Sequence, residues 1–289
     1  AELRGDLNAM SDLHDVLRLT EMGAGRFEVT QPAEAAEGRD VVFSGQYLAQ
    51  MLMAAEAREE RQKSPRSIHA LFSRVGSYTK PIELQVEVLH TGRTWGSDTI
   101  TAYQDGRLLC RSLVLMTSQD PDLMRHQPGM PADLPGPDEV ESKPSGLAFP
   151  QADWRPVPGD RSMDGVPVMY AWHRFGQAVG TPAANQAVLS WSTCGNIIGL
   201  AMSRHRDTVD ISQAHRTLNT GVIGHTIHFA EPFDVSQWLL LAHWADKAAS
   251  GRVLGRGQVF TRDGELVAEF SQDAMAKSAD REMDWQHAM

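Results

Sequence analysis

Two residues of this 289-residue chain could carry out nucleophilic chemistry together, Cys194 and His225. A cysteine becomes a nucleophile when a nearby cation or a helix N-terminus lowers the pKa of its thiol, and a histidine is a common partner. Two other interpretations stay open for the same segment. In one, Cys194 is a small buried residue, as most free cysteines are. In the other, a polar neighbour such as Thr193, Asn196, His225 or Thr226 holds a reacting water molecule together with Gln272.

The segment around Cys194 has a counterpart near the start of the chain. Phe43-Ser44-Gly45-Gln46 precedes Thr193-Cys194-Gly195-Asn196 by roughly 150 residues, and a histidine follows each segment, His69 and His225. A hairpin signal then follows in each half, Asp105-Gly106 and Asp263-Gly264. The constant order predicts a duplicated domain. His69 is expected to occupy the same packing position as His225.

Each half repeats one pattern of elements. The first half has helical spacing of apolar residues and then alternating strand patterns, and the second half repeats this order. The expected helices are 45–59 and 186–203, the latter containing Cys194, and the expected strands are 25–29, 68–75, 82–90, 94–103, 107–117, 170–175, 223–229, 238–245, 252–261 and 266–275. A helix packed on antiparallel strands is an α+β unit. Two such units predict a double hot-dog, in which each long central helix is wrapped by its sheet.

The segment between the halves differs in composition. Residues 119–167 are rich in proline, which disfavours continuous helix and central strands. We therefore expect an N-terminal hot-dog over residues 1–118, a linker wrapped over the surface at 119–167, and a C-terminal hot-dog over 168–289.

Composition excludes several classes of function. Hydrophobic residues make up 42% and charged residues 22% of a chain whose net charge is -10, which is typical of a globular protein and argues against nucleic-acid binding. The apolar stretches fall short of the ~18 residues that cross a membrane. The polar start, Ala1 to Asp6, does not resemble a secretory signal. Cys110 and Cys194 fit no metal or disulfide spacing, so we expect free thiols, the cytoplasm, and no metal or cofactor.

Several short motifs, in the same order, resemble the type II acyl-CoA thioesterases, the TesB-like family. The resemblance covers about residues 25–275. It rests on Val42 to Gln50, Lys80-Pro81-Ile82, Gln104-Asp105-Gly106, His225 to Phe229, Pro232-Phe233, Trp238-Leu239-Leu240, Phe260 to Ala268 and Ser271-Gln272. It implies a hydrolase that binds fatty acyl-CoA and uses an activated water molecule to release free fatty acid and CoA. Because hot-dog sheets associate edge to edge or face to face, formation of a homo-oligomer is left open.

The family places a water molecule between an Asp on the second helix, a Thr on the next strand and a Gln on the last strand. The resemblance puts the Gln at Gln272, but the Asp position holds Cys194 and the Thr position holds Val222. The expected site is therefore Gln272 and the region of Cys194, with Gly195, Asn196, His225 and Thr226 binding the substrate.

Two rivals remain on the same fold. The first is an acyl-CoA-binding protein without catalysis, which would explain the lost Asp and Thr. The second, a hydratase, needs an Asp and a His near a helix start, and neither Ser44-Gly45-Gln46 nor Cys194-Gly195-Asn196 supplies that pair.

Overall fold

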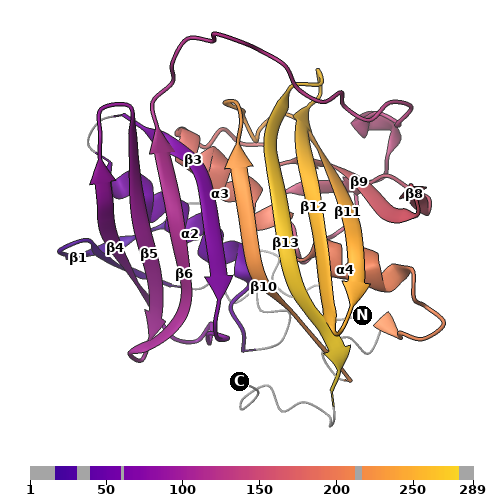
Figure 1. The fold of residues 1–289 in the computed structure, drawn as a ribbon, viewed down its shortest axis with the longest axis horizontal. Coiled ribbons are helices and arrows are strands. Elements are labelled where there is room, and N and C mark those ends of the chain that lie inside the picture. Colours follow the sequence, from indigo (N-terminus) through magenta and orange to yellow (C-terminus); the bar gives the residue numbers. More distant parts are fainter. Residues whose placement is uncertain (1–16, 31–39, 60–61, 212–216, 280–289) are drawn as a thin grey trace, which may run out of the picture.

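One large antiparallel sheet carries helices on one of its faces (Figure 1). The computed structural model describes residues 17–30, 40–59, 62–211 and 217–279, so the first residues, on which the expectation about a secretory signal rests, lie outside the described part. The strand order is β1-β2-β4-β5-β6-β3-β10-β13-β12-β11-β9-β7, and β8 pairs with β9. Every pair is antiparallel.

The first half forms the predicted helix and strands. Its helix is buried along most of its length, because the sheet lies on one side and the second half lies on the other. The bounds are β1 Thr20–Gly23, β2 Arg26–Val29, α2 Ser44–Arg58, β3 Ser64–Phe72, β4 Ile82–Thr91, β5 Trp95–Gln104 and β6 Arg107–Thr117. β3 begins four residues before the expected Ile68, because Ser64 already pairs with Thr117 of β6.

The second half follows the same plan with one difference. Its bounds are β9 Val166–Arg174, α3 Pro182–Thr193, α4 Asn196–Ser203, β10 Leu218–Phe229, β11 Leu239–Ala249, β12 Arg252–Thr261 and β13 Leu266–Ser278. The single helix expected over 186–203 is wrong, since the chain forms two helices that break at Cys194 and Gly195. Gly195 has φ +90°, a conformation that favours glycine and that a continuing helix cannot contain.

The proline-rich segment is more ordered than a plain linker. It contains a 3-10 turn η2, Pro137–Glu139, two short strands, β7 Asp153–Pro156 and β8 Arg161–Met163, and the first residues of β9. Prolines are accommodated because Pro156 ends β7, and Pro167 lies where β9 pairs with β8 only. Part of the segment is buried, since Ala148, Phe149 and Trp154 pack in the large core. Trp172 of β9 also donates from Nε1 to Pro135 O at 2.9 Å.

Buried side chains form two hydrophobic clusters on opposite faces of the second half's sheet. Alternate residues of β11 divide between them: Leu239 and Leu241 pack in the large core with the helices, whereas Leu240 and Trp244 pack with Val140 and Val157 of the proline-rich segment. That segment therefore covers the outer face of β9, β11 and β12, the face away from the helices.

The strand order shows the duplication. From the outside inward, β2-β4-β5-β6-β3 in the first half corresponds to β9-β11-β12-β13-β10 in the second. The innermost strands, β3 and β10, pair with each other and join the halves into one sheet, with His69 opposite Thr226. The expectation that His69 mirrors His225 is wrong. His225 is buried on the helix face, whereas His69 points to the outer face.

The two helices meet closely at the start of α2. A Cβ atom on Gly45 would lie 2.5 Å from the backbone oxygen of Trp191 in α3, so only glycine allows this approach. Gly199 of α4 is also helical, but its Cβ position is open.

The pair Gly45 and Gly199 gives a direct test of this packing. Gly45→Ala is expected to lower the free energy of unfolding by about 1–3 kcal/mol, because the added methyl meets rigid backbone. Gly199→Ala is expected to raise it by about 0.5–1 kcal/mol through its helix propensity. Urea unfolding of both variants measures the difference. Equal effects would contradict the close helix contact.

Three buried histidines lie within the second half, His173 on β9, His225 on β10 and His243 on β11. Burial disfavours their charged forms and lowers the pKa of His173 and His243 to about 4 and that of His225 to about 3. The neighbouring Gln272 amide partly opposes the shift at His225. All three rings are thus neutral near pH 7.

These rings predict a loss of stability in mild acid. Unfolded histidines titrate near pH 6.5, so below this pH the unfolded chain binds protons that the folded chain does not, and the free energy of unfolding falls as pH falls. Between pH 7 and pH 5 the loss is up to about 2 kcal/mol for each ring. Urea unfolding at several pH values measures it. His243→Gln should reduce the slope by about a third. Stability that does not change from pH 7 to pH 5 would contradict the prediction.

Candidate functional site

The break between α3 and α4 is tied to the last strand of the sheet. Gly195 N donates to the side chain of Gln272 on β13, with 2.9 Å between N and Oε1. Gly195 is also the N-cap of α4, where backbone N–H groups lack helical partners and the helix dipole is positive. The sequence-predicted residues Gln272 and Gly195 are therefore brought together at a helix N-terminus.

A second link joins the same break to β10. Thr193 Oγ1 lies 3.0 Å from His225 Nε2 and 2.8 Å from the carbonyl oxygen of Ser190. A hydroxyl has only one proton, and Thr193 donates it to Ser190, so the histidine ring must donate from Nε2. In a neutral ring the other nitrogen, Nδ1, is then a hydrogen-bond acceptor.

His225 and Gln272 lie directly opposite each other on β10 and β13. Both side chains are buried, at 2% and 1% exposure. Within the described part of the chain, neither His225 Nδ1 nor Gln272 Nε2 makes a full hydrogen bond. A buried polar atom left unpaired costs about 1–3 kcal/mol. The two side chains interact with each other, as the effect of Gln272 on the pKa of His225 shows, and the same acceptor and donor could each bond a small polar guest such as water.

A neighbouring serine makes a parallel contact that sequence reasoning missed. Ser192 Oγ lies 2.9 Å from His173 Nε2 and accepts from Phe149 N at 2.8 Å. The signal available in the sequence was the pair Ser192-Thr193 at the end of an apolar helix. The two hydroxyls fix two buried rings on different strands, β9 and β10.

Cys194 is at the expected place but has the wrong chemistry for a nucleophile. Its side chain is fully buried, and burial raises the pKa of its thiol. The structure thus contradicts the nucleophile interpretation and supports that of a small packing residue. Val222, at the family Thr position, is buried as well.

Thr226 does not join this site. It points to the outer face of the sheet, where its Oγ1 lies 3.2 Å from His69 Nδ1. Its side chain therefore lies on the opposite face of the sheet from those of His225 and Gln272, because neighbouring residues of a strand point to opposite faces. Asn196 stays near the site, and its Nδ2 donates to Ser192 O at 3.1 Å across the helix break.

Apolar side chains from distant segments cover the start of α4. A Cβ atom on Gly195 would lie 3.1 Å from Leu147 Cδ2 and 3.6 Å from Phe43 Cε2. Phe43 also packs on Trp191, with 5.8 Å between ring centroids. The first half and the proline-rich segment thus both contribute to the apolar surroundings of the site, which sequence reasoning had not assigned.

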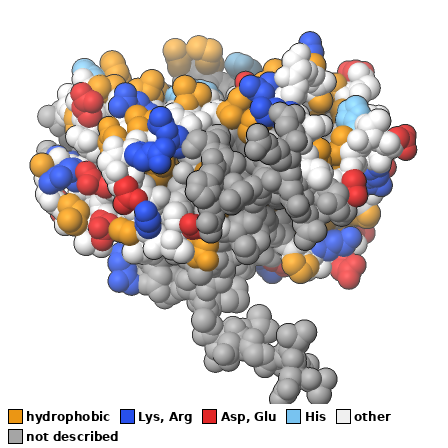
Figure 2. All heavy atoms as spheres, turned by 90° about the horizontal axis from the view of Figure 1, so that it is seen from below, with side chains coloured by type: hydrophobic (Ala, Val, Ile, Leu, Met, Phe, Trp, Pro, Cys, Tyr) orange, Lys and Arg blue, Asp and Glu red, His pale blue; other side chains and the backbone are white. Residues whose placement is uncertain are grey.

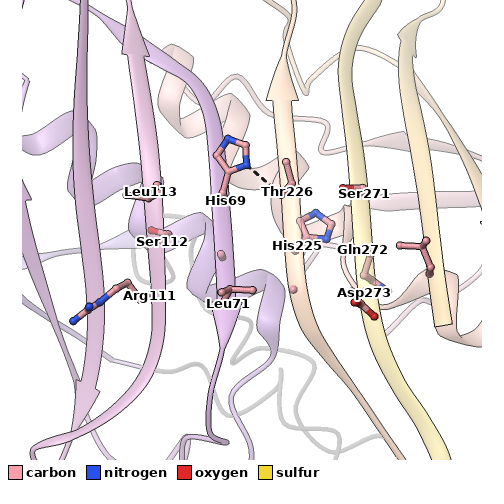
Figure 3. Close-up of a pocket in the computed structure, with 13 residues that line it drawn as sticks. His69, Leu71, Arg111, Ser112, Leu113, His225, Thr226, Ser271, Gln272 and Asp273 are labelled. Carbon is pink, nitrogen blue, oxygen red and sulfur yellow. Dashed lines mark hydrogen bonds between the residues drawn. The ribbon is translucent and has the colours of Figure 1, made fainter. Parts of the chain in front are cut away.

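A pocket of about 470 Å³ lies on the opposite face of the same strands (Figure 3). His69, Leu71, Thr226 and Asp273 lie on the outer face at this pocket. Arg111 lies at its edge and turns toward β5, where its Nε donates to Thr101 Oγ1 at 3.0 Å. The strands that carry His225 and Gln272 form its floor, while those two side chains are buried on the helix side. His225 and Gln272 are nevertheless among the residues that line this pocket, so the pocket and the helix-break site share these two strand positions.

Within residues 17–30, 40–59, 62–211 and 217–279, no group of three His, Cys, Asp or Glu side chains could hold a metal ion. None of the helices in this part of the chain is long and apolar enough to cross a membrane.

Two family models match this chain in succession. Residues 32–118 match the acyl-CoA thioesterase N-terminal domain, and residues 152–275 match acyl-CoA thioesterase. Acyl-CoA thioesterase 2 of Haemophilus influenzae is 26% identical over 257 residues, which cover 82% of this chain and 87% of that protein. Acyl-coenzyme A thioesterase 8 of Rattus norvegicus is 23% identical over 270 residues, covering 83% and 81%.

Solved structures confirm the double hot-dog fold. An acyl-CoA thioesterase II, TesB2, from Mycobacterium marinum has a TM-score of 0.80 and 22% identity and covers 93% of this chain and 99% of that one. A hot-dog protein from Alicyclobacillus acidocaldarius has a TM-score of 0.73 and 22% identity, covering 92% and 98%. With the successive family matches and this fold, the chain belongs to the type II acyl-CoA thioesterase family.

Proposed function

We propose that this protein hydrolyses fatty acyl-CoA to free fatty acid and CoA at the break between α3 and α4. Membership of the family supports the reaction class. The location of the reaction is supported by one observation. His225 Nδ1, an acceptor, and Gln272 Nε2, a donor, lie next to each other beside the N-terminus of α4.

The chemistry needs a water molecule aimed at the thioester carbonyl. In the proposed route, His225 Nδ1 accepts a hydrogen bond from the water, and Gln272 Nε2 donates one to it. The water oxygen attacks the carbonyl carbon, and the tetrahedral intermediate then breaks its C–S bond to release the CoA thiolate. The proton lost by the water ends on that sulfur.

The low pKa of His225 defines its part in this route. A general base works best when its pKa lies near the working pH, and the pKa of His225 is about 3. The ring therefore orients the water and gives little driving force for removing its proton. We expect slower hydrolysis than a carboxylate at position 194 would support.

The N-terminus of α4 is suited to the negative charge that develops on the carbonyl oxygen. Backbone N–H groups at a helix start stabilise anions. In the unliganded chain the amide oxygen of Gln272 accepts from Gly195 N, so a neutral carbonyl group already occupies this donor. The thioester carbonyl would take its place during the reaction, when the Gln272 side chain turns toward the water.

The fatty acyl group is proposed from the apolar side chains around Gly195, namely Phe43, Leu147 and Trp191. The cytoplasm is proposed as the compartment, supported by the two free cysteines. The alternative, an acyl-CoA-binding protein without turnover, is favoured by the residues at the two lost family positions, Cys194 and Val222.

Gln272 and Cys194 separate these possibilities. Gln272→Ala is expected to lower kcat by about 100-fold, because it removes the donor to the water. Cys194→Ala should change kcat less than about twofold. Thiol release from an acyl-CoA series, followed with a chromogenic reagent, measures both. Full activity of Gln272→Ala would place the site elsewhere, and a wild-type chain that binds acyl-CoA without thiol release would establish the binding protein.

His225 and His173 form a matched pair, because both are buried and both bond a hydroxyl at the end of α3. His225→Gln should lower kcat at least about tenfold, and His173→Gln should lower it less. The two variants are expected to have similar free energies of unfolding. Since the pKa of His225 is about 3, its titration should add no inflection to the kcat profile between pH 5 and 8. An inflection near pH 6.5 that His225→Gln abolishes would contradict the orienting role.

A further inference from the structure

The helix-break site is closed in the unliganded chain. Thr193 and Cys194 are fully buried, and His225 and Gln272 are 2% and 1% exposed. Gly195, the N-cap of α4, is buried as well. A fatty acyl-CoA can reach these groups only when part of the surrounding structure moves aside, as lids and loops do in many enzymes.

Two side chains stand between Gly195 and solvent, those of Leu147 and Phe43. Leu147 Cδ2 lies 3.1 Å and Phe43 Cε2 lies 3.6 Å from the position that a Cβ atom on Gly195 would occupy. Both residues are half-buried, whereas Gly195 is buried. A single layer of apolar side chains therefore separates this point of the site from water.

Phe43 is the fixed side of this cover. Its ring packs on Trp191, with 5.8 Å between centroids, and its carbonyl oxygen accepts from Gln46 N at 3.0 Å. The preceding residue, Val42, donates from N to Gly76 O at 2.8 Å. These bonds hold Phe43 to α2 and to the first half.

Leu147 is held more locally. It lies in a turn of the proline-rich segment, and its N donates to Ser145 Oγ, two residues away, at 3.3 Å. A bond between residues so close in sequence can move together with the turn. Turning Leu147 away from Gly195 therefore costs apolar contact, which is individually weak, and leaves that hydrogen bond in place.

Phe149 limits how much of the segment has to move. It is 2% exposed, and its N donates to Ser192 Oγ at 2.8 Å. Its ring packs edge to face on Trp191 and Phe175, with 5.2 Å and 5.3 Å between centroids. Rotation about the backbone bonds just before Phe149 is thus enough to move Leu147, while the core contacts of Phe149 stay intact.

A route through the sheet from the outer pocket would disturb far more structure. His225 and Gln272 line that pocket as strand positions, but β10 and β13 are paired from Leu218 to Phe229. A passage between these strands would break several backbone hydrogen bonds and leave their buried groups unpaired. The cover at Leu147 is the easier part of the wall to open.

We propose that Leu147 is the gate through which acyl-CoA enters the site, and that it turns away from Gly195 while Phe149 stays in place. The gate rests on the proposed function for the identity of the ligand. The passage between Leu147, Phe43 and Trp191 is apolar, which suits a fatty acyl chain. The phosphate groups of CoA remain outside, because burying an unpaired charge is highly unfavourable. The chain's own charges follow the same rule, and Figure 2 shows Lys, Arg, Asp and Glu side chains spread over the surface seen from below.

Cys194 can report the opening. Its thiol is next to Gly195 and fully buried, so N-ethylmaleimide modifies it only in open molecules. When opening and closing are fast, the rate of modification is proportional to the open fraction. Cys110 on β6 is equally buried in the first half and reports general loosening instead. Mass spectrometry of the digested protein measures the two cysteines separately.

Leu147→Ala should raise the modification rate of Cys194 by about tenfold or more, because it removes most of the apolar contact that favours the closed state. The rate at Cys110 should not change. Leu134→Ala is the matched control, since Leu134 is a half-buried leucine of the same segment that packs on the outer face of β9, β11 and β12. It should leave both rates unchanged. An unchanged rate at Cys194 in Leu147→Ala, or an equal rise at Cys110 or in Leu134→Ala, would overturn the gate.

A ligand that cannot be hydrolysed separates this result from the proposed function. The thioether S-dodecyl-CoA should slow the modification of Cys194 in the wild type and in Leu147→Ala, because its chain fills the space beside Gly195. Faster modification in Leu147→Ala without protection by S-dodecyl-CoA would support the gate and contradict the acyl-CoA site. Protection in both proteins, with no faster modification in Leu147→Ala, would support the acyl-CoA site and overturn the gate.

Discussion

The antiparallel pairing of β3 with β10 fixes almost every relation between the two halves. It joins two units into one sheet, and so it sets the helices of both units side by side on the same face. The close contact of Gly45 with the backbone of Trp191 follows from that placement. So does the position of Phe43, a residue of the first half, against a helix start in the second. The site is thus part of one half but is enclosed by both.

The two copies have diverged at the same point of their plan. In the first half α2 runs without interruption from Ser44, whereas in the second half the chain breaks and Gly195 N donates to Gln272. A break exposes backbone N–H groups within a buried apolar setting, which a continuous helix cannot do. Duplication therefore supplies one copy for scaffolding and leaves the other to provide polar groups.

The repeated pattern in the sequence was sufficient for the fold, because apolar periodicity and the hairpin signals depend on local chemistry. It did not show the helix break, since Cys194-Gly195 interrupts an otherwise apolar helical pattern without changing its period. It also misplaced His69 relative to His225. The register of β10 against β13 shifts between Val222 and Gly224, and the register of β3 against β6 shifts between Pro65 and Ser67. A register shift changes which residues share a face of the sheet. Gln272 was identified only through the resemblance to the family. Its bond to Gly195 depends on tertiary contacts that no local pattern encodes.

The ends of the sheet have a consequence of their own. The outermost strands, β1 and β7, are only four residues long, and β7 finishes at a proline, which has no N–H to offer. A broad open sheet has edge strands with which strands of other chains can pair, so that the sheet grows. Within the described part of the chain, the end strands β1 and β7 themselves offer few backbone groups to another chain. Short end strands of this kind are one way in which proteins limit the lateral, amyloid-like addition of further strands.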